Sequence, residues 1–428
     1  MTADPIDLRH SLTWRWALET SLNDQSPLED RHQSFELTWK PELEAKLGPK
    51  TRLSSSLRLR ADAFDRLAPG RPDRVSVSSI NQPLEIGDRL ELELRELTLE
   101  IQAGDTWWTL GKQQIVWGKA DGLKVLDVVN PQDLREFILE DFKDSRIPLW
   151  AIRAEVPVGS TTFQWLWIPD RTYHLLPESG AAFEPTSPRL VPPTPDGFTV
   201  ESLPIQRPTR WLEDSDAGLR VSAFFKGWDL TFNYLYHFAD IPALYRTIDI
   251  GPTGPSIRVA PRYERSHLIG GTFANAFGDL TLRGELGYST DRFVSVNEAD
   301  DVDGVARGQE LAWVLGLDGY GLSDTIWSVQ LFHNHLTGVD QPLFIEPTET
   351  RLTWLVRRTF MNERLEAELQ WLHDLDLDDG LARAEIRYDW TDTLGVELGI
   401  DVFYGDRDGL FGQFDSRDRL VLQGTWSP

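Results

Sequence analysis

Charged residues that could act on a solute recur at every second position along much of this sequence. In the stretch R-A-E-I-R-Y-D-W (383–390), charged residues alternate with apolar or aromatic ones. Successive side chains of a β-strand point to opposite sides, so this strand would have one charged and one apolar face. Opposite charges on one face can form cross-strand ion pairs that hold a wall, or a field that orders a polar or charged solute.

We expect many strands to contribute to one charged interior. The residues assigned to this interior are the arginines Arg15, Arg58, Arg60, Arg153, Arg220, Arg283, Arg351, Arg357, Arg383 and Arg387 and the acids Glu91, Glu93, Glu366 and Glu368. For any single residue of this set, a structural ion pair is the simpler role. A direct role in selecting the solute is the more specific alternative.

The sequence shows no arrangement typical of an enzyme or a metal centre. It has no cysteine, which removes disulfides, thiolate ligands and thiol nucleophiles. His333 and His335 lie two residues apart on one strand face, but no acidic third ligand is clearly placed. Ser266 and His267 are neighbours, so they point to opposite faces and cannot form a dyad. We therefore predict no enzymatic activity, no metal and no cofactor.

Composition narrows the class of protein. The formal net charge is −25, so nucleic acid is not an expected partner, because its recognition needs clustered Lys and Arg. There are 17 Trp and 20 Phe, yet mean hydropathy is −0.35 and no apolar run approaches the roughly 18 residues of a membrane helix. The start, M-T-A-D-P, has no signal-peptide pattern, so an exported form would have lost its signal peptide.

Short turns and longer loops alternate along the chain. Turns rich in Gly, Asn and Asp are predicted at 48–50, 103–105, 158–160, 226–229, 277–279, 321–324, 361–364 and 391–393. Mostly longer connections are predicted at 21–32, 65–88, 118–146, 169–211, 238–256, 290–306, 337–348, 376–380 and 406–412. Together they join eighteen strands, and an even number lets the first strand pair with the last. A phase slip near Arg95 and Glu96 indicates a β-bulge.

This pattern predicts an all-β fold, a transmembrane antiparallel β-barrel of 18 strands that occupies residues 1–428 as one domain. A soluble β-sandwich would alternate too. However, its strands are shorter, and it lacks short turns at one end with long loops at the other. Aromatic residues near strand ends, such as Trp107, Trp150 and Trp390, are typical of the girdles at the two membrane interfaces. We therefore predict location in the cell outer membrane.

The connection 118–146, which would be the third extracellular loop, is expected to fold into the barrel. Asn130 and Pro131 predict the start of a short helix with an apolar stripe that includes Phe137. A loop this apolar should not stay in water, and packing over the barrel mouth is the alternative to entering the lumen. The residues predicted to line a constriction are Lys119, Asp121, Lys124, Asp127, Asn130, Asp133, Arg135 and Phe137.

The segment also carries a resemblance. The strand G-K-Q-Q-I-V-W-G (111–118), the following N-P-Q-D (130–133) and the return R-I-P-L-W (146–150) resemble a Gram-negative outer-membrane barrel family with a domain of unknown function. The resemblance is firm over about 111–170 and only architectural elsewhere. The resemblance implies partnership with exporters of the resistance-nodulation-division (RND) type and movement of a lipidic or polyanionic solute. The architecture is also similar to the alginate-export porins, although acids are interleaved with the arginines here.

Three functions remain open at this point. The first is an outer-membrane channel or exporter subunit that passes a polar or amphipathic solute through a charged lumen gated by loop 118–146. The second is a lipid hydrolase carried on the barrel. The third is a structural or assembly barrel without conductance. For the first, the expected partners are outer-membrane lipid and lipopolysaccharide, the translocated molecule, and periplasmic or RND-type export proteins.

Overall fold

A computed structural model describes the chain except residues 1–5, 21–31, 65–73, 87–88, 253 and 299–300. Eighteen strands close into one antiparallel barrel: β1 (Ile6–Glu19), β2 (His32–Gly48), β3 (Thr51–Asp62), β5 (Leu90–Ala103), β6 (Thr106–Gln113), β7 (Leu149–Val158), β8 (Thr161–Ile168), β10 (Asp216–Phe225), β11 (Trp228–Phe238), β14 (Arg265–Phe277), β15 (Leu280–Ser295), β16 (Val305–Leu322), β17 (Thr325–Thr337), β18 (Thr348–Phe360), β19 (Leu365–Asp374), β20 (Asp379–Thr391), β21 (Leu394–Tyr404) and β22 (Arg419–Trp426). The predicted closed barrel is confirmed.

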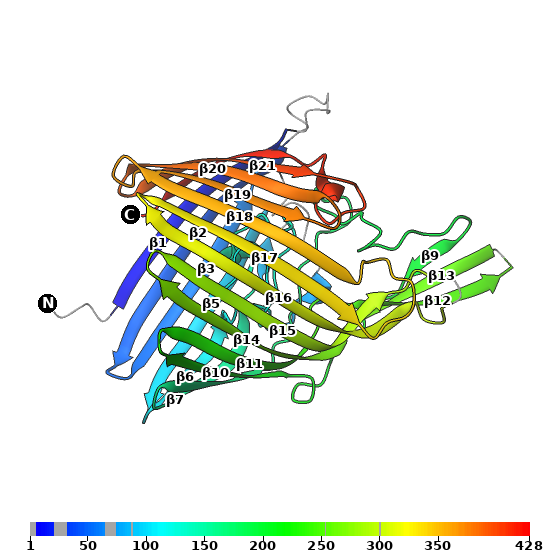
Figure 1. Cartoon of the computed structure of the whole chain (residues 1–428), viewed down its shortest axis with the longest axis horizontal. Helices are drawn as coiled ribbons and strands as arrows, with labels where there is room; N and C mark the ends of the chain where they lie inside the picture. The colour runs from blue at the N-terminus through cyan, green and yellow to red at the C-terminus, as the bar shows by residue number, and fades with distance from the viewer. Residues whose placement is uncertain (1–5, 21–31, 65–73, 87–88, 253, 299–300) are drawn as a thin grey trace.

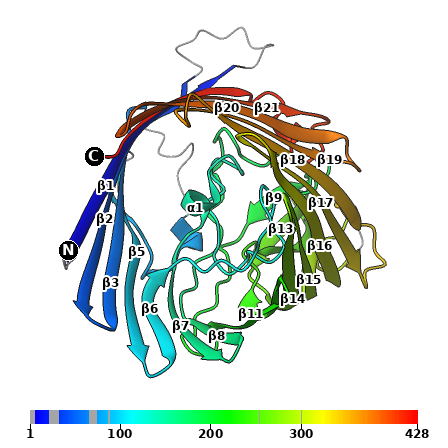
Figure 2. The same cartoon turned by 60° about the vertical axis from the view of Figure 1, so that its left-hand side comes forward.

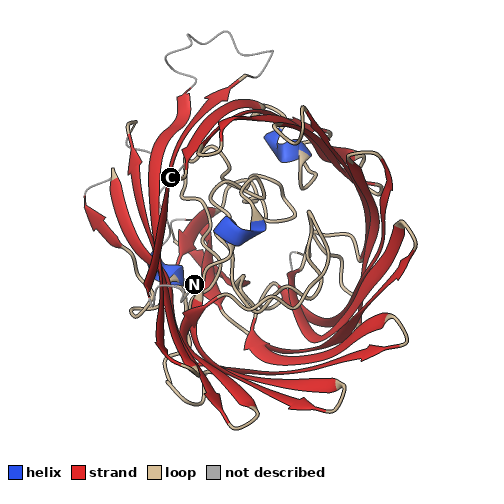
Figure 3. Cartoon of the chain, turned by 90° about the vertical axis from the view of Figure 1, so that its left-hand side faces the viewer, coloured by secondary structure: helices blue, strands red, loops and turns tan. Residues whose placement is uncertain are grey.

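Closure occurs where the first strand meets the last. β1 pairs with β22 from Leu12–Trp426 to Glu19–Arg419, and with β2 on its other side. The ring is seen end-on in Figure 3. Both chain ends and the short turns lie at one end of the barrel, and the long connections lie at the other (Figure 1). In transmembrane barrels the short turns face the periplasm, so we call the other end extracellular.

Side chains separate by alternation, as the sequence pattern predicts. On β15, Leu286 is 51% exposed on the outer face, whereas its neighbour Glu285 is 3% exposed and faces the interior. The predicted bulge on β5 is confirmed, because the register with β3 shifts between Ser56 and Leu57 opposite the residues around Arg95. The extra residue changes which side of the strand faces the interior, so both halves of β5 keep their leucines outside.

The remaining strands were not predicted. β9 (Thr199–Ser202), β12 (Ala243–Gly251) and β13 (Gly254–Arg262) form a three-stranded sheet that projects beyond the extracellular end (Figure 1). Residues 238–256 were expected to form a loop, because long connections were expected to lack strands. The short β4 (Leu84–Ile86) pairs with the extracellular part of β5.

Helical structure is scarce. The described residues contain one short α-helix, α1 (Phe142–Ser145), and the 3₁₀ turns η2 (Arg74–Ser76) and η3 (Gly412–Phe414). None of the helices in the described part of the chain is long and apolar enough to cross a membrane.

Candidate functional site: the interior of the barrel

The chain leaves the barrel wall after Gln113 and returns at Leu149, and the residues between occupy the inside of the ring. Figures 2 and 3 show α1 and its flanking segments within the circle of strands. We call residues 118–146 the interior segment. Its side chains bind wall residues from β1 and β2 on one side and from β11, β15 and β17 on the other. The segment therefore crosses the lumen and does not lie over the mouth.

The predicted helix start at Asn130 is wrong. The Asn130 carboxamide accepts a hydrogen bond from Ile115 N at 2.6 Å and donates to Gln113 O and Ile147 O, so it joins the two ends of the segment and caps no helix. Residues 131–133 run antiparallel to 145–147, with Asp133 N donating to Ser145 O. The only helical turn begins later, at Phe142, and the predicted apolar stripe does not form.

One wall carboxylate holds the first turn of the interior segment. The Glu285 side chain accepts hydrogen bonds from the backbone N–H groups of Lys119, of Ala120 at 2.7 Å and of Leu126 at 2.9 Å. Nearby, Arg283 forms an ion pair with Asp121 and also binds Asp318 on the wall at 2.8 Å. Glu285 thus satisfies three donors that would otherwise be buried without partners.

The opposite side of the segment is held by a buried ion cluster. Glu136, 2% exposed, forms ion pairs with Arg15 of β1 and, at 2.7 Å, with Arg419 of β22. Arg419 also binds Asp401 at 2.7 Å. Each of these charges is out of water, and each is paired, which is the condition for keeping charges buried. The first and last strands therefore share one carboxylate of the interior segment.

A second cluster lies against β3 and β5. Arg58 binds Glu93 and Arg60 binds Glu91, both at 2.7 Å, and Arg135 of the interior segment pairs with its neighbour Asp133 and lies 3.9 Å from Glu91. These ladders are cross-strand pairs of the kind that stabilise a sheet.

The other predicted interior residues also face inward. Four of these arginines form ion pairs with acids of the wall: Arg351 with Asp374 at 2.9 Å, Arg357 with Glu368 at 2.6 Å and with Glu366 at 3.6 Å, Arg383 with Asp401 at 2.8 Å, and Arg387 with Asp389 at 3.2 Å. Two others donate hydrogen bonds to uncharged groups: Arg153 to the Thr109 hydroxyl and Arg220 to Val116 O, both at 3.1 Å. The remaining residues predicted for a constriction bind nearby groups: Lys119 pairs with Asp229, Lys124 with Asp127, and Asp127 with Arg146.

The interior is less uniformly charged than the alternation suggests. Trp117 is fully buried inside the ring, where it packs against Gly218 and donates to Gln164 Oε1 at 2.8 Å. It belongs to an apolar cluster that includes inward-facing Leu235 and Phe332 of the wall. Phe137 packs in another cluster, with its ring 5.0 Å from that of Phe414. Apolar side chains of the segment thus explain why some wall positions facing the interior are also apolar.

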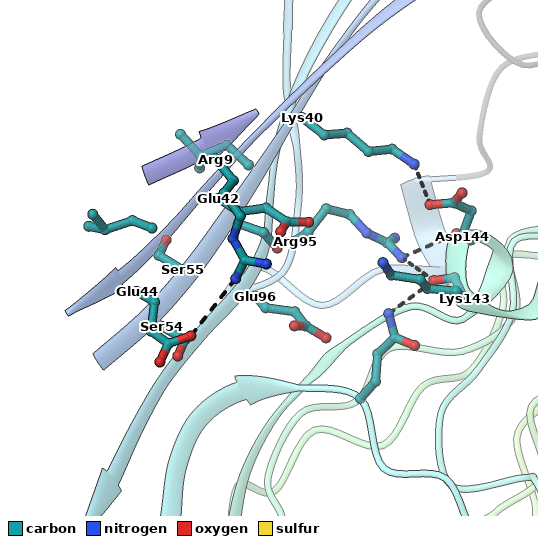
Figure 4. Close-up of a pocket in the computed structure, with 14 residues that line it drawn as sticks. Arg9, Lys40, Glu42, Glu44, Ser54, Ser55, Arg95, Glu96, Lys143 and Asp144 are labelled. Atoms are coloured by element: carbon teal, nitrogen blue, oxygen red, sulfur yellow. Dashed lines mark hydrogen bonds and ion pairs between the residues drawn. The ribbon is translucent and has the colours of Figure 1, made fainter. Parts of the chain in front are cut away.

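Two of the cavities inside the barrel border the interior segment on its periplasmic and extracellular sides. The periplasmic one, about 300 Å³, lies between β2, β3 and β5 and the turn α1 (Figure 4). Lys40 binds Asp144 across it at 2.5 Å, and Arg95 donates to the carbonyls of Lys143 and Arg146. Lysine, arginine and acidic side chains thus surround this space, which suits a polar solute better than a hydrocarbon.

The extracellular cavity, about 290 Å³, is lined by Lys124, His174, Asp240 and residues of β14 to β17. Burial and the neighbouring charge of Lys124 lower the pKa of His174 to about 3, and its Nδ1 accepts a hydrogen bond from Gln132 N. Burial and the carboxylate of Asp216 raise the pKa of Asp240 well above its usual range. His174 therefore stays uncharged near neutral pH, and the shift at Asp240 favours its neutral form, so this cavity is less charged than its residue types suggest.

Glu140 gives the interior segment a pH dependence near neutrality. Burial and the charges of Asp133 and Glu136 raise its pKa to about 7, against the opposing effect of Arg58 and Arg60. A carboxyl with a raised pKa stabilises the folded state below its unfolded value of roughly 4.3, and this contribution is lost as the pH rises through the folded pKa.

We therefore expect single-channel conductance to rise between about pH 6 and about pH 8, because ionised Glu140 loosens the segment. Replacing Glu140 by glutamine should remove that rise and leave the conductance at its low-pH value. An unchanged pH profile in this variant would assign the dependence to another group.

Sequence reasoning missed several residues of the site. Glu136 carries no spacing signal, because it lies in a segment read as a helix. Asp170 accepts four hydrogen bonds just beyond β8, among them that of Asn81 Nδ2 at 3.0 Å, and only its position at a strand end could have drawn notice. Glu285 shows the alternation of an inward residue, but its partners are backbone groups that no pattern reveals.

A closed barrel of eighteen strands with a charged, partly filled interior defines an outer-membrane β-barrel of the porin kind. The chain belongs to the family described as "Protein of unknown function (DUF1302)", whose match covers residues 97–422. This confirms the predicted membership in a family with a domain of unknown function, and the protein lies in the outer membrane. No curated protein matches the chain.

Three solved structures share this fold at low sequence identity. Acinetobacter baumannii OccAB3 is 10% identical with a TM-score of 0.54 and covers 100% of this chain and 99% of its own. A BenF-like porin from Pseudomonas fluorescens Pf-5 is 8% identical with a TM-score of 0.53, and 99% of each chain is covered. Pseudomonas aeruginosa OpdK, solved with vanillate, is 9% identical with a TM-score of 0.51 over 99% of this chain and 98% of its own. At this identity the likeness shows the fold.

Proposed function

We propose that this protein is an outer-membrane channel in which the interior segment restricts the passage of polar or amphipathic solutes. The observation that carries the proposal is the attachment of residues 118–146 to opposite walls of the barrel, through Glu285 on one side and Glu136 on the other. A porin-like barrel provides the aqueous path, and a segment held across it sets the width of that path.

The charges support a solute that carries both polar and apolar parts. Most of the interior arginines pair with carboxylates, so the lumen offers both signs of charge and not an uncompensated cationic track. Apolar side chains such as Trp117 and Phe137 interrupt the charged surface. This arrangement suits an amphipathic or dipolar solute better than a simple polyanion. A periplasmic or RND-type export partner follows from the family resemblance alone and is part of the proposal.

Conductance in planar bilayers tests the function. The full chain should give small, steady single-channel currents, and a chain lacking Ala120–Asp144 should give currents several-fold larger, because the lumen loses the segment that fills it. Heat-modifiable migration on gels checks that the shortened barrel folds. If both folded chains are closed, the lumen is blocked by something else and the channel proposal fails.

A further inference from the structure

The hydrogen-bonded wall is interrupted between β5 and β7. β6 pairs with β5 only from Leu97–Lys112 to Ala103–Thr106, because the chain turns into the lumen after Gln113. The extracellular half of β5 has the three-residue β4 beside it, and in the described chain β4 pairs with no other strand. Over this stretch residues 76–86 fill the wall between β5 and β7. We call the junction of this segment with β7 and β8 the seam.

Side chains, and not a strand ladder, hold most of the seam. The Asp170 carboxylate, 2% exposed, accepts hydrogen bonds from Ser78 Oγ at 2.5 Å, Thr172 Oγ1 at 2.8 Å, Asn81 Nδ2 at 3.0 Å and Trp150 N at 3.1 Å. An interrupted ladder at a lipid-facing wall survives only where its polar groups find other partners. Asp170 is one main partner here. Arg207 is another, because it donates to Val77 O at 3.1 Å, to Ser76 O at 3.4 Å and to Arg171 O at 2.6 Å, so a few side chains hold the seam.

The outer face carries an apolar groove directly below the seam. Its volume is about 390 Å³, and leucine or isoleucine side chains of four strands line it: Leu53, Leu97, Leu99, Leu110 and Ile152. Gly111 forms part of its floor, at φ +123°, and a Cβ there would lie 2.0 Å from Leu97 O. Trp150 closes the upper end and donates to Ile80 O of the seam at 2.8 Å.

The seam is a thin layer. Leu84 and Ile86 are 59% and 60% exposed on the outer side, whereas Glu85 between them lines a cavity of about 50 Å³ inside the wall. Arg58 and Arg135 line the same cavity from the lumen side. A path from the groove to the charged interior therefore crosses only residues 80–86. At about 50 Å³ the inner cavity is smaller than the roughly 150 Å³ of a cavity that accepts benzene, so a hydrocarbon chain passes only when residues 80–86 move aside.

We propose that this seam is a lateral portal. The aliphatic chain of a single-chain amphiphile binds in the groove and passes between residues 76–86 and β7 into the lumen. The occupant is an amphiphile because one end of the path is hydrocarbon and the other is charged. The proposal rests on the proposed function, since it names the class of solute and its route. No covalent step is involved.

A disulfide across the seam tests the route, because the chain has no cysteine of its own. Ser78 Oγ and Thr172 Oγ1 are 3.2 Å apart, so Ser78→Cys with Thr172→Cys places two sulfurs within reach of a bond that locks the seam. Thr231→Cys with Thr272→Cys is the matched control. Their hydroxyl oxygens are 2.9 Å apart and join β11 to β14, where the ladder is continuous.

The probe is palmitate with a photoreactive diazirine at the chain end, added to proteoliposomes and mapped by mass spectrometry after illumination. In the protein with Ser78→Cys and Thr172→Cys in the reduced state, label should appear both on groove peptides and on peptides that line the lumen. Oxidation should reduce lumen labelling to the level of a dark sample and leave groove labelling unchanged. The oxidised control protein, with Thr231→Cys and Thr272→Cys, should keep both the groove labelling and the lumen labelling. Conductance is measured on the same samples and should not change, which separates failure of the portal from failure of the channel.

A groove-filling variant provides an independent readout. Leu97→Trp should reduce labelling of the groove several-fold, whereas Leu315→Trp, on a 47% exposed outward position far from the seam, should not. Label spread evenly over the outer face, groove label without lumen label, or equal loss of lumen label in both oxidised cysteine pairs would each overturn the portal. If Leu97→Trp does not fold, the disulfide pair still decides the question.

Discussion

Replacing Glu285 by alanine should raise single-channel conductance several-fold and make the current flicker. The carboxylate is the acceptor for three backbone N–H groups at the first turn of the interior segment, those of Lys119, Ala120 and Leu126. Each buried donor left without a partner costs about 1–3 kcal/mol, so the turn should leave the wall and hydrate. Planar-bilayer recording at fixed salt measures the effect.

A variant of a second glutamate separates the loss of the Glu285 hydrogen bonds, which we call the latch, from a general effect of lumen charge. Glu310 also faces the interior, and its ion pair with Arg292 on the neighbouring strand is a loose one, at 3.9 Å. Glu310→Ala removes one negative charge without touching the interior segment, and the conductance should change little. Glu285→Gln keeps an acceptor oxygen and should fall between the two alanine variants. Equal currents in Glu285→Ala and Glu310→Ala would rule out the latch.

Replacing Arg419 by alanine should destabilise the barrel more than loss of any exposed pair. Arg419 is 2% exposed and binds both Asp401 and Glu136, each at 2.7 Å. Removing it leaves two buried carboxylates short of a cation, and breaking such a pair costs about 3–5 kcal/mol. The urea midpoint for loss of the heat-modifiable folded band, measured in vesicles, should fall clearly.

The comparison variant is Arg387→Ala, which removes an arginine that is paired with Asp389 and about half exposed. Exposed pairs contribute about 0–1 kcal/mol, so the urea midpoint should hardly move. A similar shift of the urea midpoint in both variants would mean that the buried cluster stabilises the barrel no more than an exposed ion pair does. Both variants remove an arginine side chain, so the contrast between them measures the effect of burial, which includes packing of the Arg419 stem as well as its ion pairs.

The barrel could be predicted from sequence because alternation is a local property that repeats in every strand. The slip at Arg95 even located the bulge. The prediction lost accuracy where tertiary contacts replace local pattern. Asn130 and Pro131 have the residue types of a helix start, yet the Asn130 side chain is bound to Ile115 and Ile147, and residues 131–133 pair with 145–147. A helix at this point would forfeit those bonds.

The interior site was predictable only in part for the same reason. Inward arginines follow from strand phase, so their positions on the wall could be listed in advance. Which acid each one binds depends on where the interior segment lies, and no spacing encodes that. Glu136 and Asp170 lie in irregular chain. Both partners of Glu136, Arg15 and Arg419, are more than 120 residues away, and Asp170 binds Ser78 and Asn81, which are 92 and 89 residues away. Leu235 faces inward in the apolar cluster around the buried Trp117, and the alternation pattern alone cannot reveal that contact.

The position of Glu136 also bears on how the molecule is assembled. Arg15 belongs to the first strand and Arg419 to the last, and both bind this one carboxylate of a segment made between β6 and β7. A closed ring gives such a segment no easy way in, so it has to be inside before the two end strands meet. The strands then close around a segment that is already in place, and the pairing of β1 with β22 is completed last, against that segment.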